Sequence, residues 1–163
     1  METRIKRKEA PADTCRIVIA DDHFLIREGL RSILEREANL QVVGEAEDGL
    51  ELLFLLDHLK PDLVILDISM PNLQGIETAR LIKMRHPEMK ILVLTMHQER
   101  EYAVAAAAAG VEGYLLKEDA PKDLLFALET IRRGNGFVSP VLAKTLEKTN
   151  KLLGEALKYA LDS

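Results

Sequence analysis

Residues 62–67 read Asp-Leu-Val-Ile-Leu-Asp, four consecutive apolar side chains between two carboxylates. A short, continuous apolar run is typical of a strand buried on both faces, as in a parallel sheet covered by helices. We predict a strand over Asp62–Leu66. Four further runs of this kind, also without alternation of polar and apolar residues, occur at Arg16–Ala20, Gln41–Gly44, Lys90–Leu94 and Gly113–Leu116. The sequence therefore predicts five buried strands.

Longer segments separate these runs, and their apolar residues recur at helical intervals. Four segments repeat at three and four residues, the pattern of a helix with one buried stripe; the first stripe comprises Ile26, Leu30, Ile33 and Leu34. The fifth segment, residues 100–109, is nearly all alanine after Tyr102, which favours a helix with a thin core face. Five strands alternating with five helices predict an α/β fold, a doubly wound parallel sheet with helices on both faces.

The composition is that of an ordinary globular domain and excludes several classes. The 163 residues are enough for one domain with its own core, and 47% of them are hydrophobic. A net charge of -5 gives no whole-chain affinity for nucleic acid or an anionic membrane. The single Cys15 excludes an internal disulfide and a Cys-based zinc site. No apolar run approaches the ~20 residues of a membrane span, so we predict a cytoplasmic protein with no membrane partner.

Polar residues follow four of the predicted strands. Asp21 and Asp22 follow the first, Asp67 the third, Thr95 the fourth and Lys117 the fifth. The carboxyl ends of parallel strands line one crevice, so we expect these side chains to converge. Two like charges about 4 Å apart repel by about 4 kcal/mol at an effective dielectric near 20. Three carboxylates held together must therefore protonate or bind a cation.

Such a cluster suits Mg²⁺, which prefers one or two carboxylates together with phosphate oxygens. A carboxylate beside that ion can act as a nucleophile toward phosphorus, while the cation and Lys117 offset the charge on the transferring group. The cluster therefore predicts an aspartyl-phosphate. Taken singly, each residue has a plain structural explanation, a turn or cap for a strand-end Asp and a solvated surface position for Lys117. Their coincidence at successive strand ends favours a site.

The same residues stand in motifs that resemble the receiver domain of two-component response regulators. The resemblance covers residues 16 to about 140 and looks most like the nitrate-response and nitrogen-fixation branch, whose members usually carry a LuxR-type effector domain. It implies a flavodoxin-like sheet of five strands in the order 2-1-3-4-5 with five helices. The matching pieces are Ile17-Val-Ile-Ala-Asp-Asp22, Asp62-Leu-Val-Ile-Leu-Asp67-Ile-Ser-Met-Pro71 with Gly75, Leu92-Val-Leu-Thr95 and Gly113-Tyr-Leu-Leu-Lys117.

This resemblance implies a metal site around the phosphoacceptor. Asp67 would accept the phosphoryl group. Asp22 would bind Mg²⁺ directly and Asp21 through water, together with Asp67 itself and the backbone carbonyl of Ser69.

The resemblance also implies a switch. Thr95 would hydrogen-bond the phosphoryl group, Lys117 would pair with one of its oxygens, and Tyr114 would change rotamer with Thr95. The alternative for Tyr114 is a plain, partly buried strand tyrosine. Glu118 departs from the family pattern, because many receivers have a proline there, preceded by a cis bond. A cis bond before a non-proline residue costs ~3 kcal/mol, which puts that loop geometry in question here.

The predicted function is a phosphoreceiver switch rather than an enzyme. It would take a phosphoryl group from a sensor histidine kinase onto Asp67 and change conformation to control an output, transcription when an effector domain is present. The first alternative is a receiver that acts by protein interaction without phosphorylation. The second is an aspartyl-phosphate phosphatase, which Ser69 argues against because dehalogenase-like phosphatases have an acid two residues after the nucleophile. The third is a flavin-binding electron carrier, disfavoured because Asp21 and Asp22 would repel an anionic cofactor.

We divide the chain into a charged, disordered leader (1–15), a receiver domain (16–138) and a C-terminal helical linker or tail (139–163). The 23 residues after Pro140 are too few for a helix-turn-helix domain, so we expect the effector domain to be absent and the chain not to bind nucleic acid directly. The tail is interpreted as a helix that packs back on its own domain or frays. A linker helix to an effector domain and a weak heptad-like stripe that pairs two chains as a homodimer are the alternatives; the stripe comprises Leu142, Leu146, Leu153 and Leu157.

Overall fold

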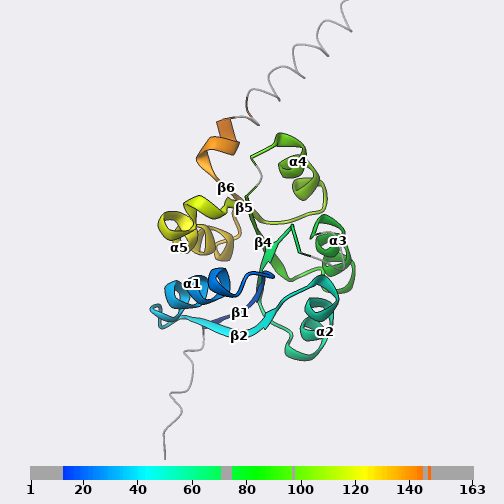
Figure 1. Cartoon of the computed structure of the whole chain (residues 1–163), viewed down its shortest axis with the longest axis vertical. Coiled ribbons are helices and arrows are strands. Elements are labelled where there is room, and N and C mark those ends of the chain that lie inside the picture. Colours follow the sequence, from blue (N-terminus) through cyan, green and yellow to red (C-terminus); the bar gives the residue numbers. More distant parts are fainter. Residues whose placement is uncertain (1–12, 71–74, 97, 145–146, 148–163) are drawn as a thin grey trace, which may run out of the picture.

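The computed structural model describes residues 13–70, 75–96, 98–144 and 147. These residues form one parallel sheet with helices on both faces (Figure 1). The strands are β1 (Cys15–Ala20), β2 (Leu40–Ala46), β3 (Leu63–Asp67), β4 (Lys90–Thr95), β5 (Gly113–Leu116) and β6 (Phe137–Val138). The helices are α1 (Phe24–Glu35), α2 (Gly49–Leu59), α3 (Gly75–Arg85), α4 (Arg100–Ala108) and α5 (Ala120–Arg132), with a 3-10 turn, η1, at Lys117–Asp119.

The strand order is β2-β1-β3-β4-β5-β6, which confirms the predicted order of the first five strands. The predicted count of five is corrected by β6, which pairs with β5 through Gly113↔Phe137 and Tyr114↔Val138. A strand of two residues is too short to show a period, so no sequence pattern reveals it. The chain reaches the sheet edge again after α5 through Gly134, whose φ of 90° lies in the left-handed region that favours glycine.

The sheet separates two hydrophobic clusters. Alternate residues of β1 illustrate the division: Ile17 and Ile19 join the cluster under α1 and α5, whereas Val18 and Ala20 join the cluster under α2, α3 and α4. Figure 1 shows the two sets of helices on opposite sides of the sheet. Both strand faces are therefore buried, which explains the continuous apolar runs in the sequence.

The helix α4 brings only small side chains to its buried face. Ala103 and Ala106 are buried there, and the ring of Tyr114 from β5 belongs to the same cluster. Leu142 joins this cluster too, with 1% of its surface exposed, and residues 140–144 are helical. The start of the predicted tail therefore packs on the domain. The rest of that tail, and the leader before Asp13, lie outside the described residues.

No helix in the described part of the chain is long and apolar enough to cross a membrane.

Candidate functional site

The register of the parallel strands brings the predicted site residues to one edge of the sheet. Ala20 pairs with Leu66, so Asp21 and Asp67, which follow them, are neighbours. Asp67 in turn pairs with Leu94, one residue before Thr95. Thr95 pairs with Leu116, one residue before Lys117, and so the five predicted polar residues lie at the carboxyl ends of four strands.

Three carboxylates at this edge, those of Asp21, Asp22 and Asp67, form an acidic cluster, and the imidazole of His23 lies beside them. One ligand atom from each of Asp21, Asp22, His23 and Asp67 lies within 4.8 Å of the others. Asp21 and Asp67 are each 1% exposed, whereas Asp22 is open to solvent. Charges that are buried this deeply require a partner. The cluster therefore has an inner pair of carboxylates and an outer carboxylate through which a cation can enter.

Lys117 is the ammonium group of this site. Its Nζ lies 3.0 Å from Asp21 Oδ2 and 3.3 Å from Asp67 Oδ2. Burial lowers the pKa of the Lys117 ammonium, but its pairing with Asp21 and Asp67 outweighs burial, so the pKa lies above its ordinary value. Lys117 is thus charged at every physiological pH and joins the two buried carboxylates.

Asp67 is held by its own loop as well as by Lys117. Its Oδ1 accepts a hydrogen bond of 2.9 Å from the backbone N–H of Ser69. The loop after β3 is anchored in turn by Gly75, whose N–H donates to the carbonyl oxygen of Ile68 over 3.3 Å. The orientation of the Asp67 carboxylate therefore depends on this loop.

The donor set of the cluster fits a hard divalent cation. Asp21 Oδ2 is buried and accepts no hydrogen bond of ordinary geometry from any described residue, although Lys117 stands beside it. The three carboxylates supply only oxygen ligands, and one lysine leaves their charge incompletely balanced. Mg²⁺ matches these properties, and Asp21, Asp22 and Asp67 are the residues that would hold it.

Thr95 and Tyr114 form a second, uncharged pair beside the cluster. Thr95 is fully buried, Tyr114 is 3% exposed, and their side chains share a hydrogen bond. Burial raises the pKa of the Tyr114 phenol to about 12, although the bond to Thr95 opposes the rise. The tyrosine is therefore turned inward against the strand end that carries Thr95.

The buried phenol predicts a pH-dependent stability. The fold favours the neutral form of Tyr114, so its contribution to stability is full below pH 10 and is lost as pH rises toward the folded pKa of about 12. We expect an ultraviolet titration of the native protein to show a phenol with a pKa of about 12, and Tyr114→Phe to remove that transition. A Tyr114 phenol that ionises near pH 10 in the folded protein would contradict this prediction.

Sequence reasoning missed two groups at this edge. His23 donates its backbone N–H to Asp21 Oδ1 over 2.8 Å, and its Nδ1 lies 3.0 Å from Asp22 Oδ1. Gln98 donates to Glu118 over 2.8 Å, which links the loops after β4 and β5. The His23 contacts are local and depend on how the loop after β1 turns, whereas the Gln98–Glu118 contact depends on how two loops meet. Neither has a spacing signal in the sequence. No described peptide bond is cis, so the loop at Glu118 differs from the proline-containing pattern.

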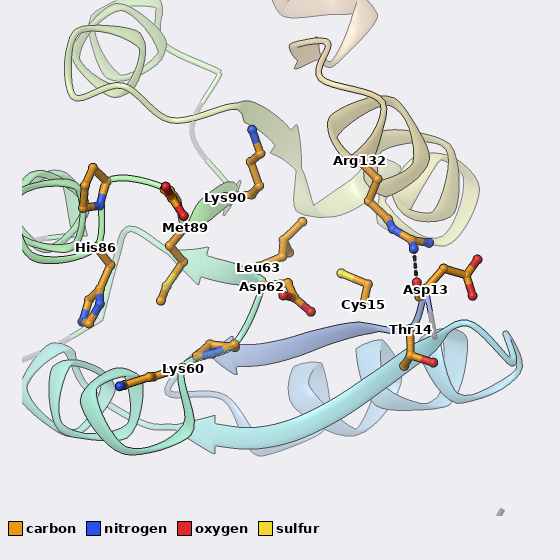
Figure 2. Close-up of a pocket in the computed structure, with 13 residues that line it drawn as sticks. Asp13, Thr14, Cys15, Lys60, Asp62, Leu63, His86, Met89, Lys90 and Arg132 are labelled. Carbon is orange, nitrogen blue, oxygen red and sulfur yellow. Dashed lines mark hydrogen bonds between the residues drawn. The ribbon is translucent and has the colours of Figure 1, made fainter. Parts of the chain in front are cut away.

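A cavity of about 720 Å³ lies at the opposite edge of the sheet, at the amino ends of β1, β3 and β4 (Figure 2). Cys15, Asp62, Lys90 and Arg132 line it, and burial raises the pKa of the Cys15 thiol to about 11. The cavity is separated from the acidic cluster by the length of the strands. It therefore takes no part in the chemistry of Asp67.

The fold and the acidic edge together define a class of signalling domain. The family model of the response regulator receiver domain matches residues 17–129, more than half of the chain, so the chain belongs to this family. Receiver domains are signalling domains of two-component systems rather than classical enzymes.

The relatives of the chain are two-component response regulators, including transcriptional regulators. It is 36% identical over 137 residues to the transcriptional regulatory protein DegU of Brevibacillus brevis, covering 84% of this chain and 58% of DegU. A LuxR-family response regulator from Aurantimonas sp. is similar with 37% identity and a TM-score of 0.81, over 84% of this chain and 98% of that one. The isolated receiver domain of RcsB from Salmonella enterica, solved with the phosphomimetic BeF3-, matches with 34% identity and a TM-score of 0.77, over 80% and 97% of the two chains. The chain thus spans about three fifths of the length of DegU.

Proposed function

We propose that this receiver takes a phosphoryl group from the phosphohistidine of a sensor histidine kinase onto Asp67, in a reaction that needs Mg²⁺. The observation that carries the proposal is the buried Asp67 carboxylate, which lies close to Asp21 and Asp22 and is joined to Asp21 by the Lys117 ammonium. Asp21, Asp22 and Lys117 surround this carboxylate. Such a set suits the transfer of an anionic phosphoryl group, because the ammonium and a cation held by the acids would balance its charge.

Several side chains would have separate roles in the phosphoryl transfer. A carboxylate oxygen of Asp67 forms the bond to phosphorus while the bond from phosphorus to the imidazole nitrogen breaks, and the imidazole keeps that electron pair. Lys117, 3.3 Å from Asp67 Oδ2, pairs with an oxygen of the incoming group. Asp21, Asp22, Asp67 and the Ser69 carbonyl would hold Mg²⁺, which offsets the charge of the phosphoryl oxygens.

The pair of Thr95 and Tyr114 supports a switch role. In the structure the Thr95 hydroxyl is hydrogen-bonded to the phenol of Tyr114. When it turns to donate to a phosphoryl oxygen instead, Tyr114 loses that partner and can take another rotamer. Because Tyr114 shares its cluster with Ala103 and Ala106, its movement changes the surface formed by α4 and β5. A surface with two arrangements is what a partner needs to read the phosphorylation state.

The organisation of the chain belongs to the same proposal. We assign the receiver to residues 16–138, a leader to residues 1–15 and a helical linker or tail to residues 139–163. We further propose a cytoplasmic location, pairing of two chains as a homodimer, and transcription as the output where an effector domain follows. Direct contact with nucleic acid is not assigned to the receiver. RcsB, a relative, is described as dimers bound to DNA, which supports the proposed homodimer and output.

The first experiment is a phosphorylation assay with and without the metal. We expect the protein, incubated with acetyl phosphate and Mg²⁺, to gain one phosphoryl group in its intact mass. After treatment with EDTA the gain should fall below detection, because Lys117 alone cannot balance three carboxylates and the incoming phosphate. Added Mg²⁺ should restore it. Equal phosphorylation with and without the metal would contradict the proposed role of Mg²⁺.

A further inference from the structure

Arg27 in α1 is a buried charged residue that neither the sheet nor the phosphoryl chemistry explains. Only 7% of its surface is exposed, which is unusual for arginine. Its Nη1 donates a hydrogen bond of 2.6 Å to the backbone carbonyl of Asp21. Its Nε lies 3.3 Å from Glu45 Oε1, and its Nη2 lies 3.4 Å from Glu47 Oε1. The two glutamates therefore form ion pairs with the guanidinium, while its Nη1 binds the Asp21 carbonyl.

The contact with Asp21 completes the restraint of that residue. The Asp21 N–H donates to the Ala46 carbonyl over 3.0 Å, and Asp21 Oδ1 accepts the N–H of His23 over 2.8 Å. Arg27 binds the backbone carbonyl oxygen of the same residue. That oxygen belongs to the peptide bond between Asp21 and Asp22. Because a peptide unit is planar, a fixed carbonyl oxygen also fixes the nitrogen and Cα of Asp22.

We propose that Arg27 is a positioning residue for the metal site, which raises the affinity for Mg²⁺ by fixing the peptide that carries Asp22. This inference rests on the proposed function, because it assumes that the cluster of Asp21, Asp22 and Asp67 binds Mg²⁺. Arg27 is not a ligand and does not touch the phosphoryl group.

The positioning role of Arg27 and its positive charge predict opposite effects on the Mg²⁺ affinity when the residue is replaced. A guanidinium near a cation site repels the cation, so removal of its charge alone would strengthen Mg²⁺ binding. Removal would also leave Glu47 without its cation and Glu45 paired with Arg31 alone, and the negative charge that is freed would attract the cation further. A weaker affinity in a folded Arg27 variant is therefore opposite to the charge effect and points to lost positioning of the Asp21–Asp22 peptide.

The test measures binding of Mg²⁺ alone, by titration calorimetry on the full chain. We expect Arg27→Met to weaken the affinity about tenfold, which corresponds to about 1.4 kcal/mol. Arg27→Lys should weaken it by a similar factor, because its ammonium keeps the charge but ends one atom short of Nη1. Arg31→Met is the matched control. Arg31 lies one turn later in α1 and binds Glu35 and Glu45, not the Asp21–Asp22 loop. The affinity of the Arg31→Met variant for Mg²⁺ should therefore stay within about twofold of that of the parent.

A second measurement separates this inference from the proposed function. With acetyl phosphate, Arg27→Met should need about tenfold more Mg²⁺ for half-maximal phosphorylation but reach the parent rate at saturation. Parent-like or tighter Mg²⁺ binding in either Arg27 variant would overturn the inference, as would an equal loss in Arg31→Met. Loss of the fold in both Arg27 variants, seen by circular dichroism, would also overturn it. A parent that binds Mg²⁺ but gains no phosphoryl group would overturn the proposed function alone.

Discussion

Replacement of Asp67 by asparagine should abolish the gain of a phosphoryl group completely. Asparagine has nearly the shape of aspartate, so the hydrogen bond from the Ser69 N–H to Oδ1 can remain. Its amide nitrogen, however, has no electron pair available for attack on phosphorus, and the amide carries no charge to pair with Lys117. Intact mass after incubation with acetyl phosphate and Mg²⁺ measures the loss directly.

Asp62→Asn is the matched control for this replacement. Asp62 precedes the same strand at its other end, where its Oδ2 accepts the N–H of Arg16 over 2.8 Å. It lies in the wall of the distant cavity rather than in the acidic cluster (Figure 2). We expect Asp62→Asn to be phosphorylated like the parent. If the Asp67→Asn variant still gains a phosphoryl group, Asp67 is not the acceptor. Asp21 and Asp22 would then be the first carboxylates to examine.

Replacement of Gly75 by alanine should be the most destabilising of the changes considered. A Cβ at this position would lie 2.1 Å from the Cα of Ile68 and 2.6 Å from its Cβ. The obstacle is backbone at the start of the Asp67 loop, which cannot turn aside as the end of a side chain can. Overpacking costs about 1–3 kcal/mol of the free energy of unfolding, and we expect a clash with backbone to lie at the upper end of that range. Chemical denaturation of the two proteins measures the difference.

The effect of Gly75→Ala should reach the acidic cluster as well. Relief of the clash moves the segment from Ile68 to Ser69, whose N–H orients Asp67, so phosphorylation should slow in the molecules that remain folded. Gly29→Ala is the control, because nothing lies within 4 Å of a Cβ built at this exposed helical position. It should stabilise the protein by about 0.5–1 kcal/mol, since alanine favours a helix over glycine. An equal loss of stability in both variants would contradict the argument from the clash.

The sheet and the place of the acidic residues could be predicted because both follow from local pattern and one topological rule. Continuous apolar runs such as Lys90–Leu94 indicate strands buried on both faces, and parallel strands bring their carboxyl ends to one edge. Asp21 and Asp67 stand 46 residues apart, and the rule still places them together. Their neighbours in space follow from the strand order, which the structure confirms.

The residues that sequence reasoning missed depend on contacts between separate elements of the fold. Arg27 falls among the polar positions of an amphipathic helix, and nothing in its spacing indicates that Glu45 and Glu47 will enclose it. The strand β6 was missed for a different reason, because two residues carry no period. Ser139, which follows that strand, has no signal either, although its Oγ accepts the N–H of Leu116 over 3.0 Å.

The short strand β6 also determines where the domain can be cut. Its backbone and Ser139 occupy donors and acceptors along the open side of β5, including the N–H of Leu116 next to Lys117. A protein shortened to residue 138 would leave that side partly bare beside the phosphorylation site, and it would lose Leu142 from the core. Bare strand edges pair with other chains and cause aggregation. A recombinant receiver should therefore retain the chain at least through Leu142.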